Sequence, residues 1–194
     1  MTPTWRIRPA LAALAVAGML LVGCSNSGTG GPSAGQYRFS STTGEGKLIP
    51  ATQRKPAAPM AGTLIGGGAF RLAEHRGRVV LVNFWASWCA PCVLESPMLN
   101  GLYRQLKDRS VDFVGIDIKD ERQSAASFIA DNQMSYPMIY DEAGKTALQL
   151  GVPVGGLPVT VLIDRAGKVA AAYTGAVHRP TILPALQRLA ADPK

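Results

Sequence analysis

The chain has 194 residues, 47% of them apolar, and a formal net charge of +7. This is enough apolar sequence for one globular core with appendages, and no internal repeat or second apolar block indicates another domain. The basic residues form no long run and no aromatic stripe alternates with them, so the charge argues against nucleic-acid binding and only weakly favours an acidic partner or an anionic surface.

The N-terminus has the features of a secretion signal. Arg6 and Arg8 precede an apolar run of 13 residues from Ala10 to Val22. This run is too short to cross a bilayer, which takes about 20 helical residues, but it suits the apolar region of a signal peptide. The run ends in Leu21-Val22-Gly23-Cys24, which resembles the lipobox of bacterial lipoproteins.

The lipobox resemblance implies a signal peptide over residues 1–23, cleaved before Cys24, and a diacylglycerol thioether on that cysteine. The protein is then expected outside the cytoplasm, anchored to the cell membrane by the lipid. The alternative is an uncleaved helix near the membrane with a chance cysteine. Residues 24–61 begin with small polar residues and glycines, which cannot bury enough apolar surface to fold, and are predicted to be a flexible tether that stays loose to about residue 60.

From residue 62 to 194 the pattern predicts one α/β domain. Residues 78–85 form a continuous apolar run rich in β-branched and aromatic residues, typical of a strand buried on both faces. Further strands are predicted at 111–118, 138–140, 159–164 and 169–173, and helices at 92–106, 121–132, 145–150 and 179–191, with Pro97 expected to kink the first. Strands that alternate with helices before a final hairpin favour a mixed sheet.

The chain has three cysteines, an odd number, which excludes a framework made only of structural disulfides. If Cys24 carries lipid, Cys89 and Cys92 are left to pair with each other. A closed zinc site is not expected, because His75 and His178 have no ligand spacing to the cysteines. No metal is predicted, and no cofactor apart from a redox-active disulfide.

The sequence Trp88-Cys89-Ala90-Pro91-Cys92 follows the buried strand directly and opens the first helix. A thiol at a helix N-terminus faces unpaired N–H groups and the positive end of the helix dipole, both of which favour the reactive thiolate. Cys89 is therefore predicted to be the nucleophile. Cys92 lies one turn into the helix on the same face, so it is predicted to resolve a mixed disulfide.

Two further positions have alternative interpretations. Glu95 is three residues beyond Cys92 and shares its face, so a buried Glu95 carboxylate could take the proton from Cys92. Equally, Glu95 could only complement the helix dipole. Pro158 precedes a predicted strand, and because only about 5% of X-Pro bonds are cis, the sequence alone favours a trans bond there.

Residues 79–92, with Glu95, Pro97 and the stretch Gly156-Leu157-Pro158-Val159-Thr160, resemble the thioredoxin superfamily. More narrowly they are similar to its membrane-anchored, extracytoplasmic TlpA/ResA-like branch. Residues 121–150 resemble the helix-strand insertion of that branch. The resemblance implies a thioredoxin-like fold from about residue 62, and it implies activity as a thiol–disulfide oxidoreductase.

The same resemblance implies roles for four residues. Pro158 would be cis and lie against the cysteine pair, Leu157 would offer backbone groups to an extended substrate, Trp88 would flank the nucleophile, and Glu95 would be catalytic. The Ala-Pro dipeptide between the cysteines differs from the Gly-Pro of reducing thioredoxins and the Pro-His of the strong periplasmic oxidant, so the direction of electron flow stays open.

The expected partners are proteins with thiols or disulfides and a membrane redox partner, and the chain is expected to be a monomer that does not bind nucleic acid. The resemblance permits reduction of apocytochrome c, oxidation of secreted proteins or defence against oxidative damage. Two alternatives are a thiol peroxidase, although the residues before Cys89 lack that class's threonine, and a copper(I)-binding module that uses Cys89 and Cys92 as ligands.

Overall fold

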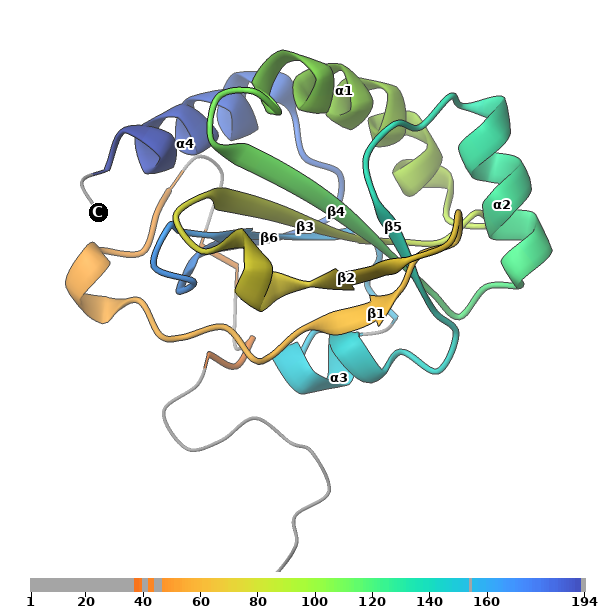
Figure 1. Cartoon of the computed structure of the whole chain (residues 1–194), viewed down its shortest axis with the longest axis horizontal. Coiled ribbons are helices and arrows are strands. Elements are labelled where there is room, and N and C mark those ends of the chain that lie inside the picture. Colours follow the sequence, from red (N-terminus) through yellow and green to blue (C-terminus); the bar gives the residue numbers. More distant parts are fainter. Residues whose placement is uncertain (1–36, 40–41, 44–46, 154, 193–194) are drawn as a thin grey trace, which may run out of the picture.

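The computed structural model describes residues 37–39, 42–43, 47–153 and 155–192. In this part of the chain, five strands form a mixed sheet in the order β5-β4-β3-β6-β7 (Figure 1). They are β3 (Val79–Trp85), β4 (Val111–Ile118), β5 (Met138–Asp141), β6 (Val159–Ile163) and β7 (Val169–Thr174). β3 pairs with β4 and β4 with β5 in parallel, whereas β3–β6 and β6–β7 are antiparallel. The predicted α/β class with a mixed sheet is confirmed.

Four helices accompany the sheet: α1 (Ala90–Leu106), α2 (Arg122–Asp131), α3 (Lys145–Leu150) and α4 (Arg179–Ala191). The predicted positions of all four are confirmed within two residues, and α1 continues through Pro97. The predicted insertion consists of α2, β5 and α3, between β4 and β6. Two short strands, β1 (Ala61–Thr63) and β2 (Ala69–Arg71), form a separate hairpin that the sequence pattern did not predict.

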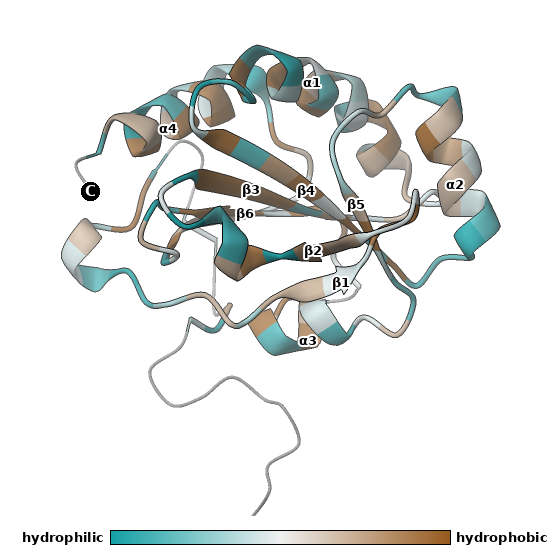
Figure 2. Cartoon of the chain, in the orientation of Figure 1, coloured by the Kyte–Doolittle hydropathy of each residue, from teal (hydrophilic) through white to brown (hydrophobic). Residues whose placement is uncertain are grey.

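β3 is central because all of its residues are buried. Its side chains alternate between two apolar cores, with Leu81 and Trp85 in one and Val82 and Phe84 in the other. Helices α1 and α4 cover the first face, and α3 and the β1–β2 hairpin lie on the second (Figure 1). Figure 2 shows apolar residues along the central strands and polar residues on the outer surfaces of the helices.

The strand register gathers several chain ends at one edge of the sheet. Trp85, the last residue of β3, is in register with Asp117 near the end of β4, which in turn pairs with Tyr140 of β5. On the other side, the antiparallel pair Phe84–Val159 places the start of β6 beside the end of β3. The loops that follow β3, β4 and β7 and the loop that precedes β6 therefore meet at this edge, which we call the active edge.

The prediction that the chain stays loose to about residue 60 is wrong for residues 47–60. Ala58 and Met60 are 2% and 3% exposed. The Ile49 N–H donates to the Ala170 carbonyl at 2.7 Å, and the Val169 N–H donates to the Lys55 carbonyl at 2.9 Å. This segment pairs with β7 because an edge strand has free backbone groups to satisfy. The domain thus begins before residue 62, while the signal peptide, Cys24 and the tether up to residue 36 lie outside the described residues.

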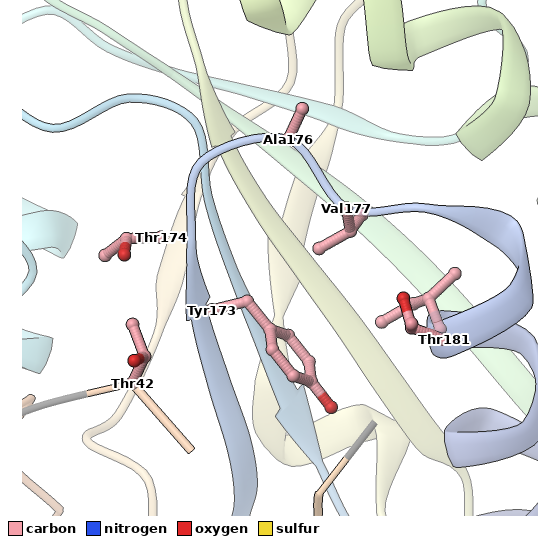
Figure 3. Close-up of a pocket in the computed structure, with 7 residues that line it drawn as sticks. Thr42, Tyr173, Thr174, Ala176, Val177 and Thr181 are labelled. Carbon is pink, nitrogen blue, oxygen red and sulfur yellow. The ribbon is translucent and has the colours of Figure 1, made fainter. Parts of the chain in front are cut away.

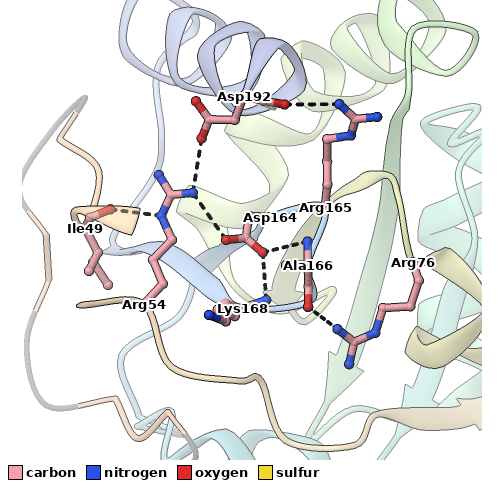
Figure 4. A network of polar contacts seen from close by, with 8 residues as sticks. All are labelled: Ile49, Arg54, Arg76, Asp164, Arg165, Ala166, Lys168 and Asp192. Carbon is pink, nitrogen blue, oxygen red and sulfur yellow. Dashed lines mark hydrogen bonds and ion pairs between the residues drawn. The ribbon is translucent and has the colours of Figure 1, made fainter. Parts of the chain in front are cut away.

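A network of polar contacts fastens the same segment to the domain (Figure 4). Arg54 donates to the carboxylates of Asp164 and Asp192 at 3.2 and 3.1 Å. The side chains of Arg54 and Asp164 are only 7% and 10% exposed, so this ion pair is largely shielded from water. Asp164 also accepts the N–H groups of Ala166 and Lys168 in the turn between β6 and β7. Arg54 therefore links the N-terminal segment, the turn and the C-terminal end of α4.

Replacing Arg54 with Met is expected to lower the free energy of unfolding by about 3 kcal/mol, because it leaves the buried Asp164 carboxylate without its cation. Chemical denaturation of the oxidised protein measures this change. Arg71→Met is the matched control: the Arg71–Glu74 pair is 65% and 66% exposed, and its loss should cost less than about 1 kcal/mol. Equal effects of the two substitutions would contradict the structural role of Arg54.

No helix in the described part of the chain is long and apolar enough to cross a membrane.

Candidate active site

The cysteine pair lies where β3 passes into α1. Cys89 is the N-cap of α1, with extended backbone angles, and Pro91 lies in the first turn, where proline fits because no helical N–H partner is needed. A disulfide joins Cys89 and Cys92, whose Cα atoms are 5.2 Å apart. Cys89 is 5% exposed and Cys92 is fully buried. Of the two cysteines, only Cys89 therefore retains any exposure to solvent.

Trp88 and the proline loop lie beside the cysteines at the active edge. Trp88 is 59% exposed, and its indole N–H donates to the Lys119 carbonyl at 2.8 Å. The Leu157–Pro158 peptide bond is cis, as the family resemblance implied and the sequence alone did not. Since Val159 pairs with Phe84, Pro158 lies level with the end of β3. Leu157 is half-buried and contacts both apolar cores.

Glu95 is a buried carboxyl group on the face of α1 that also carries Cys92. It is 4% exposed. One oxygen accepts the Asn83 side-chain amide at 2.8 Å, and the other accepts the Val177 backbone N–H at 2.9 Å. Burial raises the pKa of Glu95 to about 7, although the two hydrogen bonds act in the opposite direction. A carboxyl group with this pKa can both take and give a proton near neutral pH.

The partners of Glu95 were not predicted from the sequence. Asn83 is a polar residue within the apolar strand β3, and alternation along the strand places it on the same face as Leu81 and Trp85, toward α1. This signal was available in the sequence. The Val177 contact was not predictable, because it is a backbone group 82 residues away from Glu95.

A small cavity and a neutral tyrosine lie close to Glu95 and its partner Val177. Val177 lines a cavity of about 140 Å³ together with Tyr173 and Thr181, between the end of β7 and the start of α4 (Figure 3). Burial, and then the charge of Glu95, raise the pKa of Tyr136, so its hydroxyl stays protonated. Glu95 is thus held by two neutral donors, with no cation at hydrogen-bond distance among the described residues.

A mixed sheet, a Cys-x-x-Cys disulfide at a helix N-terminus and a cis-proline at the same edge define a thioredoxin-like protein. The chain belongs to the AhpC/TSA family, which matches residues 53–172. Two similar curated proteins are named for thiol chemistry. The thiol-disulfide oxidoreductase ResA of Geobacillus thermodenitrificans is 32% identical over 60% of this chain and 66% of its own length. The thiol:disulfide interchange protein HelX of Rhodobacter capsulatus is 34% identical over 71% of this chain and 72% of its own.

Among solved structures, the secreted thiol-disulfide isomerase of Corynebacterium glutamicum is similar to this chain. It superposes with a TM-score of 0.74 at 28% identity and covers 81% of this chain and 99% of its own. The fold and the family that the sequence predicted are confirmed. The structure brings Cys89, Cys92, Glu95 and Pro158 to one edge of the sheet, with Trp88 and Leu157 beside them.

Proposed function

We propose that this protein is an extracytoplasmic thiol–disulfide oxidoreductase that exchanges its Cys89–Cys92 couple with protein thiols and disulfides. The observation that carries the proposal is the disulfide between a slightly exposed and a fully buried cysteine at a helix N-terminus, with a buried carboxyl group one turn further on. The similarity to proteins named as thiol–disulfide oxidoreductases supports it.

The reaction proceeds in two exchange steps. The Cys89 thiolate attacks one sulfur of a substrate disulfide; the substrate S–S bond breaks, a mixed disulfide forms, and the released substrate thiolate takes a proton from water. Cys92 then attacks the Cys89 sulfur and gives its proton to Glu95. The second substrate sulfur leaves as a thiolate and takes a proton from water, and the Cys89–Cys92 disulfide is formed. Two electrons have passed to the substrate, and the reverse sequence oxidises a substrate dithiol.

The substrate is proposed to bind across Trp88, Leu157 and Pro158. Trp88 offers an exposed aromatic surface next to Cys89, and Leu157 offers backbone groups to an extended segment, as in β-strand addition. The site is therefore suited to a polypeptide with an accessible disulfide or dithiol.

Location outside the cytoplasm is proposed with a lipid on Cys24 as the anchor. The basic and apolar N-terminus and the sequence Leu21-Val22-Gly23-Cys24 support it, as does the secreted isomerase among the similar structures. Disulfides persist in that compartment, so a dithiol there exchanges electrons with other proteins.

The test is to compare the reaction of the purified protein with a protein disulfide and with hydrogen peroxide. With dithiothreitol as electron donor, the protein is expected to accelerate the reduction of insulin, while its peroxide consumption stays at the rate of a free thiol. Rapid peroxide consumption without insulin reduction would instead support the thiol peroxidase. Stoichiometric copper in the mass spectrum of the native protein, with neither activity, would support the copper(I)-binding module.

A further inference from the structure

Asp117, near the C-terminal end of β4, is a buried acid that takes no part in the two exchange steps. It is fully buried, and neither carboxyl oxygen has an amide, hydroxyl or cationic donor as its partner among the described residues; its side-chain hydrogen bond is with the carboxyl group of Asp120. An ionised carboxylate in such a place would lose its hydration without compensation. Burial, and then the neighbouring Asp120, raise the pKa of Asp117 to about 8, so it retains its proton at neutral pH.

Asp120 lies three residues further on and holds the segment that leads into Cys89. One of its oxygens accepts the Ser87 backbone N–H at 2.6 Å and the other accepts the Glu121 N–H at 2.8 Å. The adjacent Lys119 carbonyl accepts the Trp88 indole N–H. Two hydrogen bonds accepted by residues 119–120 thus fix Ser87 and Trp88, the two residues before the nucleophile.

Charged groups face Asp117 from three directions. Asp120 comes from the loop after β4, Asp141 comes from the end of β5, and both raise its pKa. Arg122 of α2 acts in the opposite direction, but its guanidinium stacks on the Tyr140 ring at 4.3 Å from the ring centroid. Glu121 and Glu142 line a hollow of about 740 Å³ with Ser87, Trp88, Lys119 and Asp120. Asp120 therefore borders a hollow that is open to water, and Asp117 lies behind it.

We propose that Asp117 is a positioning residue that shares one proton with Asp120 and thereby fixes the Ser87–Trp88 segment in front of Cys89. With the proton on Asp117, Asp120 is free to accept the Ser87 N–H as a carboxylate. Loss of that proton to water places two carboxylates side by side in a buried site. Their repulsion moves Asp120 away and releases Ser87. The inference rests on the proposed function only for its effect on exchange.

The proposed proton sharing between Asp117 and Asp120 can be tested in the oxidised full-length protein, because Cys89 and Cys92 do not titrate when they form a disulfide. The Ser87 amide proton, followed by NMR from pH 5 to 10, is expected to shift with a midpoint near pH 8. Asp117→Asn should abolish this transition and keep the low-pH shift throughout. Asp112→Asn is the matched control on the same strand, since Asp112 lies at the other end of β4 and bonds Arg78, and it should leave the transition unchanged. Glu95→Gln should also leave it unchanged.

The functional consequence is measured as the rate of insulin reduction at pH 7 and pH 9. The ratio of the Asp117→Asn rate to the wild-type rate is expected to rise several-fold between these values. A Ser87 amide that does not titrate near pH 8 in the wild type, or one that still does so in Asp117→Asn, would overturn the proposal, as would an equal rate ratio at both pH values. A Ser87 transition with no insulin reduction in any variant would refute the proposed function but leave the proton-sharing pair supported.

Discussion

Replacing Cys89 with Ser is expected to lower the rate of exchange with a protein disulfide by about three orders of magnitude, because the accessible nucleophile is lost. Replacing Cys92 with Ser should instead preserve the first step and block the second, so that a mixed disulfide between Cys89 and the substrate accumulates. The measurement is the mass of the adduct after the reduced variants are mixed with a protein disulfide, together with peptide mapping of the linked cysteine.

Cys24→Ser is the control for these variants, because it removes the third cysteine and leaves the couple intact. Its exchange rate should equal that of the wild type. An adduct on Cys92 instead of Cys89, or full activity in Cys89→Ser, would contradict the assignment of the two roles.

Replacing Glu95 with Gln is expected to remove a loss of about 3 kcal/mol in the free energy of unfolding that the wild type shows between pH 4.5 and pH 7. Below pH 4.5 the carboxyl is protonated in both the folded and the unfolded states. As the pH rises toward 7, the unfolded chain releases the proton while the folded protein keeps it, since burial raises the folded pKa to about 7. The free energy of unfolding therefore falls over this range by about 1.4 kcal/mol per unit of pKa difference, and Gln has no proton to lose.

Chemical denaturation of both oxidised proteins at pH 4.5, 6, 7 and 8 measures this effect as the difference between them. Wild type should lose stability relative to Glu95→Gln up to about pH 7 and then remain at a constant difference. Glu74→Gln, at an exposed position in the 3₁₀ turn Leu72–His75, is the control and should give a flat difference. Parallel curves for wild type and Glu95→Gln would show that Glu95 has an ordinary pKa.

The same variant should slow the release of the mixed disulfide by about 100-fold, because Cys92 loses its general base. In wild type this step should speed up as pH rises through about 7, where Glu95 becomes a carboxylate able to accept a proton. That increase should be absent in Glu95→Gln. Stopped-flow kinetics of the second step, in which the Cys89–Cys92 disulfide forms, provides the measurement. An unchanged pH profile would favour a purely structural role for Glu95.

Local patterns predicted most of the elements around the site. The continuous apolar run of β3 and the helical spacing of α1 are strong signals, and the position of Cys89 between them follows directly. The β1–β2 hairpin was missed because each strand has only three residues, separated by a stretch that contains three glycines. Residues 47–60 were expected to be loose because the glycines of Gly44-Glu45-Gly46 precede them and Pro56 and Pro59 interrupt them, yet pairing with β7 orders them.

The contacts that tune the site depend on long-range packing. Helical spacing predicted that Glu95 shares a face with Cys92, but its burial and its bond to the Val177 N–H depend on how the loop after β7 meets α1. The cis bond at Pro158 came from family resemblance and not from local propensity. The burial of Asp117 beside Asp120 likewise depends on how β4 and the loop after it pack in the sheet.

The most direct test of the central claim is the reduction potential of the Cys89–Cys92 couple, measured by alkylation after equilibration in defined dithiol–disulfide buffers. A redox enzyme requires a couple that both accepts and donates electrons, so we expect a reversible two-electron transition between about −270 and −120 mV. A potential below about −300 mV lies in the range of structural disulfides. It would contradict a redox role for the couple and indicate that the bond only stabilises the start of α1.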